Sequence, residues 1–128
     1  MTYTHNRLLS GTDIDDADTR MREALKAKGF GVLTEIDVQK TMKQKIDRDM
    51  DGYRILGACN PDMAWEAMGL EPRIGAMLPC NVILRSVDGG TEVSAIDPVA
   101  SMSEVDNAEL HKVAGQVRDM LIEAVDVA

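Results

Sequence analysis

An apolar stripe at helical spacing, close to the C-terminal end of the sequence, is the feature that most constrains the fold. Apolar residues recur there every three or four positions over residues 110–125. Such spacing predicts an amphipathic helix that buries one side against a core. This helix is the clearest element in the sequence. Its stripe consists of Leu110, Val113, Ala114, Val117, Met120, Leu121, Ala124 and Val125.

Two apolar runs ahead of this helix predict a hairpin. Residues 80–87 and 91–97 are separated by Asp88-Gly89-Gly90, a strong turn signal between strands. Earlier strands and helices alternate, so the predicted class is α+β, a sheet with helices packed against it. These earlier elements are strands at residues 2–9, 30–36 and 53–58, helices at residues 13–28, 38–46 and 61–68, and a helical or irregular turn at residues 73–78.

Local signals mark where the predicted helices begin and end. Thr12 is the predicted N-cap of the first helix, and Gly29 is placed to stop it. Asp37 is expected to cap the second helix. Asn60 followed by Pro61 combines an N-cap residue with proline at the first helical position, which predicts the start of the third helix.

Length and charge limit the function classes. The 128 residues argue for a single domain over residues 1–128, and 14 basic against 22 acidic residues give a net charge of −8. This balance argues against a nucleic-acid binder that neutralises phosphates. Residues 1–60 hold 10 acids and 10 bases, whereas residues 61–128 hold 12 acids and 4 bases. The N-terminus resembles no signal peptide and no run is long enough for a membrane span, so we expect a cytoplasmic protein without a membrane partner.

Two Cys-Asn pairs are the most informative motif. Cys59-Asn60 follows one predicted strand and Cys80-Asn81 opens the next, with about twenty residues between them. If these strands are antiparallel neighbours, the connection returns the chain to the same end of the sheet. The two sulfurs are then expected to lie close together.

The chemistry of such a pair leaves two interpretations open. Cys59 precedes a predicted helix N-terminus, where backbone N–H groups favour a thiolate, and Asn60 and Asn81 offer amide hydrogen bonds to a bound anion. The pair would then carry out dithiol redox chemistry, carry a persulfide or bind a soft metal. The preferred interpretation is that both cysteines are small buried hydrophobes. Neither a CxxC motif nor a metal-ligand spacing is present, so no metal site is predicted.

Arg54 lies within a predicted strand near this motif. Its guanidinium could bind a carboxylate or phosphate of a ligand. An ion pair within the protein, with Glu35 or Asp97, is the preferred interpretation.

Three segments and a closing Asp97-Pro98 resemble the domain-of-unknown-function 302 family. They are residues 29–38, 53–61 and 74–82, in the family's order, and the resemblance covers residues 12–125. It implies a small curved antiparallel sheet with a long helix against one face, similar to the TATA-box-binding-protein-like architecture, and a homodimer. It implies no established activity. The family-pattern positions are Thr34, Glu35, Asp37, Arg54, Cys59, Asn60, Pro61, Pro79, Cys80 and Asn81.

These observations lead to three hypotheses. The first is a small-ligand-binding homodimer with a pocket near the cysteines, for a thiol, persulfide or other anion. The second is a sulfur-transfer or redox enzyme that uses Cys59 and Cys80, with Cys59 as nucleophile. The third is a structural or interaction protein with core cysteines. The sequence identifies neither a cofactor nor a substrate. The candidate ligand-binding residues are Arg54, Cys59, Asn60, Cys80 and Asn81.

Overall fold

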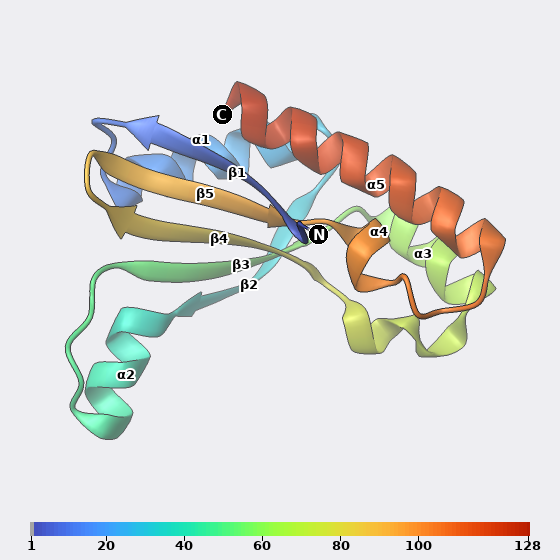
Figure 1. The fold of residues 1–128 in the computed structure, drawn as a ribbon, viewed down its shortest axis with the longest axis horizontal. Helices are drawn as coiled ribbons and strands as arrows, with labels where there is room; N and C mark the ends of the chain where they lie inside the picture. Colours follow the sequence, from blue (N-terminus) through green and yellow to red (C-terminus); the bar gives the residue numbers. More distant parts are fainter. Residues whose placement is uncertain (1) are drawn as a thin grey trace.

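The computed structural model describes residues 2–128, which form one sheet and a set of helices (Figure 1). Strands and helices alternate along most of the chain, and a hairpin precedes the two last helices. The elements are β1 (Thr4–Ser10), α1 (Ile14–Ala27), β2 (Gly31–Asp37), α2 (Val38–Ile46), β3 (Tyr53–Cys59), α3 (Pro61–Leu70), the 3-10 helix η1 (Pro72–Met77), β4 (Cys80–Val87), β5 (Gly90–Ile96), α4 (Pro98–Ser101) and α5 (Ala108–Val127).

The sheet has five strands in the order β1-β5-β4-β3-β2, and every neighbouring pair is antiparallel. Strands β4 and β5 form the predicted hairpin. Gly89 lies in its turn and Gly90 opens β5, and both have positive φ, a backbone conformation that glycine adopts without steric cost. The predicted α+β class is confirmed.

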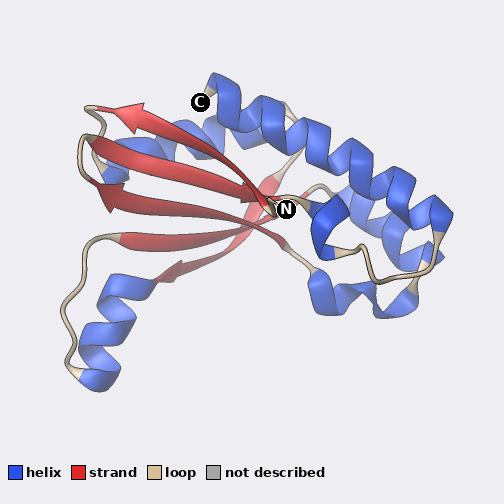
Figure 2. Cartoon of the chain, viewed as in Figure 1, coloured by secondary structure: helices blue, strands red, loops and turns tan. Residues whose placement is uncertain are grey.

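The two faces of the sheet differ. Helices α1 and α5 pack on one face, the covered face (Figures 1 and 2). The register places Leu56, Val82 and Ala95 in one row on this face, and all three are buried. On the opposite face, the open face, Ile36, Ile55 and Ile83 lie side by side across β2, β3 and β4.

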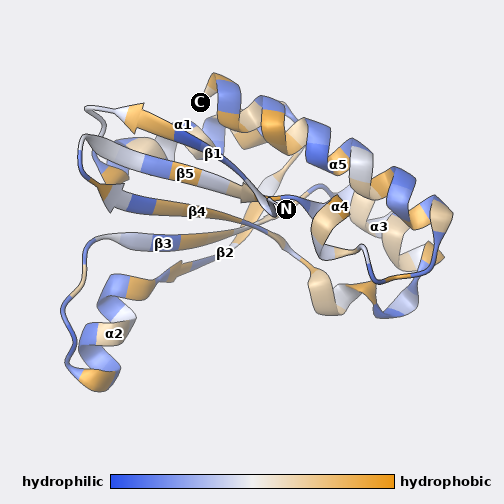
Figure 3. Ribbon diagram, viewed as in Figure 1, coloured by the Kyte–Doolittle hydropathy of each residue, from blue (hydrophilic) through white to orange (hydrophobic). Residues whose placement is uncertain are grey.

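The core lies between the covered face and the two helices. Met21 and Leu25 of α1 and Leu121 and Val125 of α5 are completely buried or nearly so. Hydrophilic and hydrophobic residues are interspersed along the whole length of helix α5 (Figure 3), as expected of an amphipathic helix with one side on the sheet. Among residues 2–128, no helix combines the length and the apolar character needed to cross a membrane.

The helix boundaries confirm most of the predicted caps. The side-chain oxygens of Asp37 and Asn60 accept hydrogen bonds from the backbone N–H groups of Lys40 and Met63. Gly29 follows α1 with a φ of 83°. Thr12 was the wrong N-cap for α1, because the neighbouring Asp13 has the extended backbone and accepts from the N–H of Asp16.

The structure differs from the sequence-based prediction at the end of α3 and after β5. Helix α3 continues through Gly69 to Leu70 rather than ending at the glycine. Pro98 begins the short helix α4, which the sequence analysis did not predict. Asp97 caps this helix by accepting hydrogen bonds from the N–H groups of Val99 and Ala100. Proline at a first helical position is favourable, since its missing N–H has no partner there in any case.

Candidate functional site

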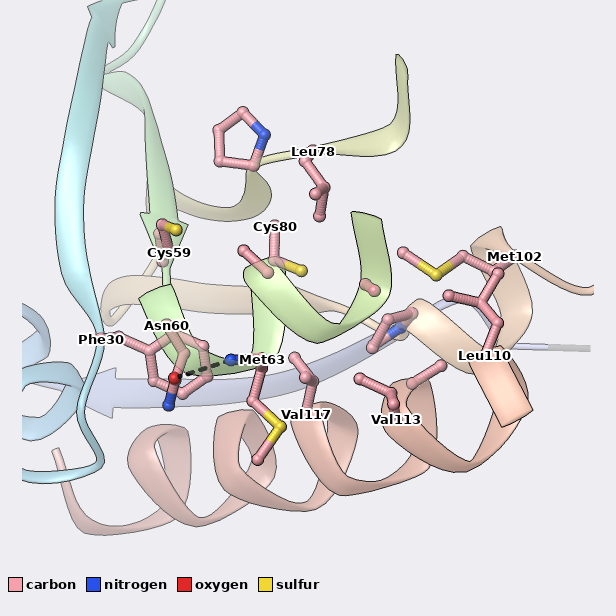
Figure 4. A pocket seen from close by; sticks show the side chains of 16 residues that line it. Phe30, Cys59, Asn60, Met63, Leu78, Cys80, Met102, Leu110, Val113 and Val117 are labelled. Carbon is pink, nitrogen blue, oxygen red and sulfur yellow. Dashed lines mark hydrogen bonds between the residues drawn. The ribbon is translucent and has the colours of Figure 1, made fainter. Parts of the chain in front are cut away.

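A small cavity lies where β3 ends and β4 begins, beneath α3 and against α5 (Figure 4). Its volume is about 40 Å³. One water needs roughly 10–15 Å³ measured in this way, so the cavity has room for a molecule of about three heavy atoms. The lining residues are Phe30, Ala58, Cys59, Asn60, Met63, Ala64, Ala67, Leu78, Pro79, Cys80, Pro98, Met102, Leu110, Val113, Ala114 and Val117.

The cavity lining is apolar. Apart from the amide of Asn60, the side chains that line it present carbon and sulfur, and the part of the chain that the structure describes places no charged side chain among them. An anion that entered would lose its hydration without gaining a positive charge. The cavity therefore suits an uncharged ligand.

The two cysteines meet at this cavity from opposite faces of the sheet. Strands β3 and β4 are antiparallel neighbours, as the hypothesis of adjacent sulfurs required, and Ala58 lies directly opposite Cys80. Cys59 is the next residue along β3, so its side chain emerges on the other face of the sheet from that of Cys80. Both side chains line the cavity because it lies at the very end of the two strands.

The two thiols have different environments. Cys80 is buried, with 7% of its surface exposed, whereas Cys59 is half-buried. Burial raises the pKa of the Cys80 thiol to about 11, and the nearby charge of an ionised Cys59 adds to the shift. Cys80 therefore stays protonated at neutral pH and acts as an apolar wall. Cys59 is the thiol that solvent can reach.

Asn60 uses its side chain to hold the site together. Its oxygen accepts from the N–H of Met63 at 3.3 Å, which caps α3, and its Nδ2 donates to the carbonyl of Lys28 at 3.4 Å. The same amide lies so close to Gly29 that a Cβ there would approach Nδ2 to 3.2 Å. Asn60 thereby joins the end of α1 to the start of α3 at the cavity's edge.

Arg54 lies outside the cavity and forms ion pairs on the covered face. Its guanidinium donates to Asp18 at 3.0 Å and to Asp15 at 2.5 Å, both on α1. An internal ion pair was the preferred interpretation, but its partners are these aspartates and not Glu35 or Asp97. Burial alone would raise the pKa of Asp18, but hydrogen bonds from Arg22 and Arg54 outweigh burial and hold that pKa below its usual value.

Asn81 is not among the residues that line the cavity. It pairs with Gly57 on the open face, where it is exposed and lines a shallow hollow of about 550 Å³. The structure thus brings Cys59, Asn60 and Cys80 to one cavity, and places Arg54 and Asn81 elsewhere.

Sequence reasoning missed most of the apolar wall. Met63 and Ala67 of α3 face Val113 and Ala114 of α5 across the cavity. The apolar stripe did predict that the α5 residues are buried. It could not show that a cavity remains between α5 and α3. Met102 lies just beyond α4, which had no sequence signal of its own beyond Asp97-Pro98.

Gly57 shapes the strand pair that carries the cysteines. A Cβ at this position would overlap Thr34 Oγ1 and approach Pro79 Cγ to 2.6 Å. Glycine therefore allows the segment before Cys80 to lie directly on β3. This close approach sets the position of Pro79 and Cys80 at the cavity.

Comparison with known proteins identifies the family. The family model described as "Domain of unknown function DUF302" matches residues 6–128. The chain belongs to the DUF302 family. Its fold is also that of a crystal structure of an uncharacterised conserved DUF302 protein from Bacillus stearothermophilus, with a TM-score of 0.92, 23% sequence identity and coverage of 98% of each chain. Among curated proteins, no relative matches the chain.

Proposed function

We propose that this DUF302 domain is a small-ligand-binding module whose site is the cavity between the ends of β3 and β4 and helices α3 and α5. One observation carries the proposal: two cysteines from opposite faces of the sheet line a single apolar cavity. A well-packed core leaves few voids of this size. The family match supports the fold on which the site is built and assigns no ligand.

The chemistry of the lining favours an uncharged ligand. Carboxylates and phosphates would find no cation in the cavity, because Arg54 is paired with Asp15 and Asp18 of α1, and one of the two amide N–H groups of Asn60 already donates to Lys28. A neutral thiol or a similarly small apolar molecule would gain van der Waals contacts with the lining and sulfur contacts with Cys80. Of the ligands considered from the sequence, a small neutral thiol therefore fits best. The unpaired thiols also suit a reducing compartment such as the cytoplasm.

Titration of the isotope-labelled protein with ethanethiol tests this proposal, with ethanesulfonate as the charged analogue of the same carbon skeleton. Amide chemical shifts of cavity-lining residues such as Ala67 and Ala114 should move with ethanethiol and saturate. They should not move with ethanesulfonate. Absence of saturable shifts with ethanethiol, or equal shifts with both compounds, would contradict the proposal.

A thiol-chemistry enzyme is the second candidate, and the unequal environments of the two cysteines favour it. Cys59 is half-buried and immediately precedes the N-cap of α3, whereas Cys80 stays protonated. In a sulfur-transfer step, the Cys59 thiolate would attack the outer sulfur of a hydropersulfide, R–S–SH. A new S–S bond forms at Cys59 as the donor's S–S bond breaks, and the departing thiolate keeps the electron pair and takes up a proton from water.

Mass spectrometry after incubation with a low-molecular-weight hydropersulfide distinguishes this candidate. Sulfur transfer predicts the addition of one sulfur atom to Cys59, retained in Cys80→Ser and absent from Cys59→Ser. A protein that gains no sulfur, or gains it equally in Cys59→Ser, would exclude Cys59 as the acceptor. Ethanethiol binding without sulfur transfer would leave the binding module as the function.

A further inference from the structure

The hollow on the open face, here called the open-face hollow, is a second place where a small molecule could bind. Helices α1 and α5 pack on the other face of the sheet (Figure 2). Its volume of about 550 Å³ lies in the range of roughly 300–1,000 Å³ that is usual for small-molecule sites. Most of the side chains that line it are polar, whereas the lining of the cavity near the cysteines is apolar. The two sites therefore suit different chemistry.

Strand register brings polar side chains from four strands together in the open-face hollow. Tyr53, Arg85 and Glu92 lie side by side in one row across β3, β4 and β5. Asn6 of β1 and Ser94 of β5 are opposite each other in the next row. Residues two apart along a strand share a face and lie roughly 7 Å apart, while adjacent strands are roughly 4.8 Å apart. The polar groups of both rows are therefore within reach of one small ring.

An ion pair in the hollow combines free donors with a free acceptor. Nη2 of Arg85 donates to Oε1 of Glu92 at 2.6 Å, and Oγ of Ser94 donates to the same oxygen at 3.4 Å. Within residues 2–128, these are the hydrogen bonds that the two charged groups form with other side chains. A guanidinium has five N–H donors and a carboxylate has two accepting oxygens. The pair thus balances its own charge and still offers N–H groups beside Oε2 of Glu92.

Uncharged groups complete the hollow. Asn6 and Asn81 are exposed there, and each side-chain amide can both donate and accept. Ser94 lies between Asn6 and Ile83 in the register and is only 3% exposed, which fixes its hydroxyl in the floor. Ile83 and Ile96 are half-buried and add apolar surface between the polar groups. The hollow therefore offers donors, acceptors and apolar contacts together, with no net charge.

This combination selects against charged ligands. An anion near Arg85 also meets Glu92, and a cation near Glu92 also meets Arg85, so attraction and repulsion largely cancel. A zwitterion would have to separate this pair in order to place its own two charges. A hydroxyl group both donates and accepts, so two neighbouring hydroxyls can accept from Arg85 and donate to Glu92 while the pair stays intact.

We propose that the open-face hollow binds a neutral sugar in its pyranose form. Two adjacent hydroxyls of the sugar contact Arg85 and Glu92, and a further hydroxyl contacts the amide of Asn81. The C–H groups of the ring pack on Ile83 and on the aromatic ring of Tyr53, which is half-buried at the edge of the hollow. This site is independent of the cavity near the cysteines, because the two linings share no residue.

Chemical-shift titration of the isotope-labelled full chain with the methyl glycosides of glucose, galactose and mannose tests the site. These probes are uncharged and their rings cannot open. The amide shifts of Ile83 and Ser94 should move and saturate with at least one of them, at roughly millimolar concentration for a ligand of this size in a shallow site. Ala67 and Ala114 line the other cavity, and their shifts should stay unchanged, so the result does not depend on ethanethiol binding.

Three further probes define the chemistry of the ligand. Glucose 6-phosphate adds negative charge, glycine is a zwitterion, and cyclohexanol keeps a six-membered ring with a single hydroxyl. Each should bind more weakly than the preferred glycoside.

Two variants test the assigned contacts. Arg85→Met combined with Glu92→Met should raise the dissociation constant of the glycoside at least tenfold. Lys112→Met combined with Glu109→Met is the matched control, because it removes an exposed ion pair of α5 with the same change in net charge, and it should bind as the unmodified chain does. Both pairs are at the surface, so circular dichroism should show an unchanged fold. Asn81→Val, at an exposed strand position, should weaken binding without touching the ion pair.

Several outcomes would overturn the proposal. They are the absence of saturable shifts with all three glycosides, binding of glucose 6-phosphate, glycine or cyclohexanol as tight as that of the glycosides, and equal binding by the Arg85/Glu92 variant and the unmodified chain.

Discussion

Cys59 and Cys80 lie on opposite faces of the sheet, and both line the same cavity. This is possible because the cavity is at the end of the sheet, where a side chain from either face can reach past the last backbone hydrogen bonds. The arrangement separates the two thiols chemically. Cys80 belongs to the buried wall, whereas Cys59 stands between the cavity and solvent.

Thiol-specific reagents should therefore distinguish the two cysteines. With a pKa of about 11, only about one Cys80 thiol in a thousand is ionised at pH 8, and burial limits access further. We expect rapid modification of one thiol in the folded protein, retained in Cys80→Ser. Cys59→Ser should react only on unfolding. Absorbance-based labelling kinetics with and without denaturant measures both rates, and fast labelling of Cys80 in the native protein would contradict the assignment.

Substitution of Gly57 should destabilise the protein. Gly57→Ala introduces a methyl group that overlaps Thr34 and meets Pro79 Cγ at 2.6 Å, so we expect a loss of about 2–3 kcal/mol in the free energy of unfolding. Gly115→Ala, in α5 with open space around the new methyl, is the matched control and should stabilise by up to about 1 kcal/mol. Urea denaturation compares the two variants. Equal effects would show that the close approach at Gly57 relaxes without cost.

The ion pairs of Asp18 should make stability depend on pH. The folded protein holds the pKa of this carboxyl below its ordinary value of about 3.9, so its contribution is full above pH 4 and is lost as pH falls through the lower folded pKa. We expect Asp18→Asn to cost about 2 kcal/mol at pH 7, because it weakens charge-assisted hydrogen bonds to Arg22 and Arg54.

The difference between Asp18→Asn and the unmodified protein should shrink below pH 4, in urea denaturation repeated across pH. Asp119→Asn is the control, since its pair with Arg118 is largely exposed and should contribute less than about 1 kcal/mol. A loss for Asp18→Asn that stays constant down to pH 2 would refute the depressed pKa.

Much of the fold follows from short-range sequence signals. The stripe on α5, the Asp88-Gly89-Gly90 turn and the Asn60-Pro61 helix start depend on periodicity and local backbone preference, and the structure confirms all three. The N-cap of α1 is Asp13 and not Thr12. Both residue types are good N-caps, so the sequence does not distinguish two neighbouring candidates, and helix ends are uncertain by a residue or two.

The candidate site was less predictable. The pairing of β3 with β4 was only a condition of the hypothesis of adjacent sulfurs, and the structure contains that pairing. Which face each cysteine occupies depends on the register of the strands, and a shift by one residue would move each side chain to the other face. The partners of Arg54 were mispredicted because α1 is 36 and 39 residues away in sequence and no local signal encodes its docking. A cavity is a gap between elements, so no single segment of sequence contains it.

The most direct test of the binding site compares ethanethiol affinity in two variants of α5. Ala114→Leu adds three carbons inside the cavity, whereas Ala108→Leu adds them at an exposed position of the same helix. Leucine is a good helix former, so both variants should fold. Chemical-shift titration should show ethanethiol binding to the unmodified protein and to Ala108→Leu, and its loss in Ala114→Leu. Unchanged binding in Ala114→Leu would contradict the cavity as the site.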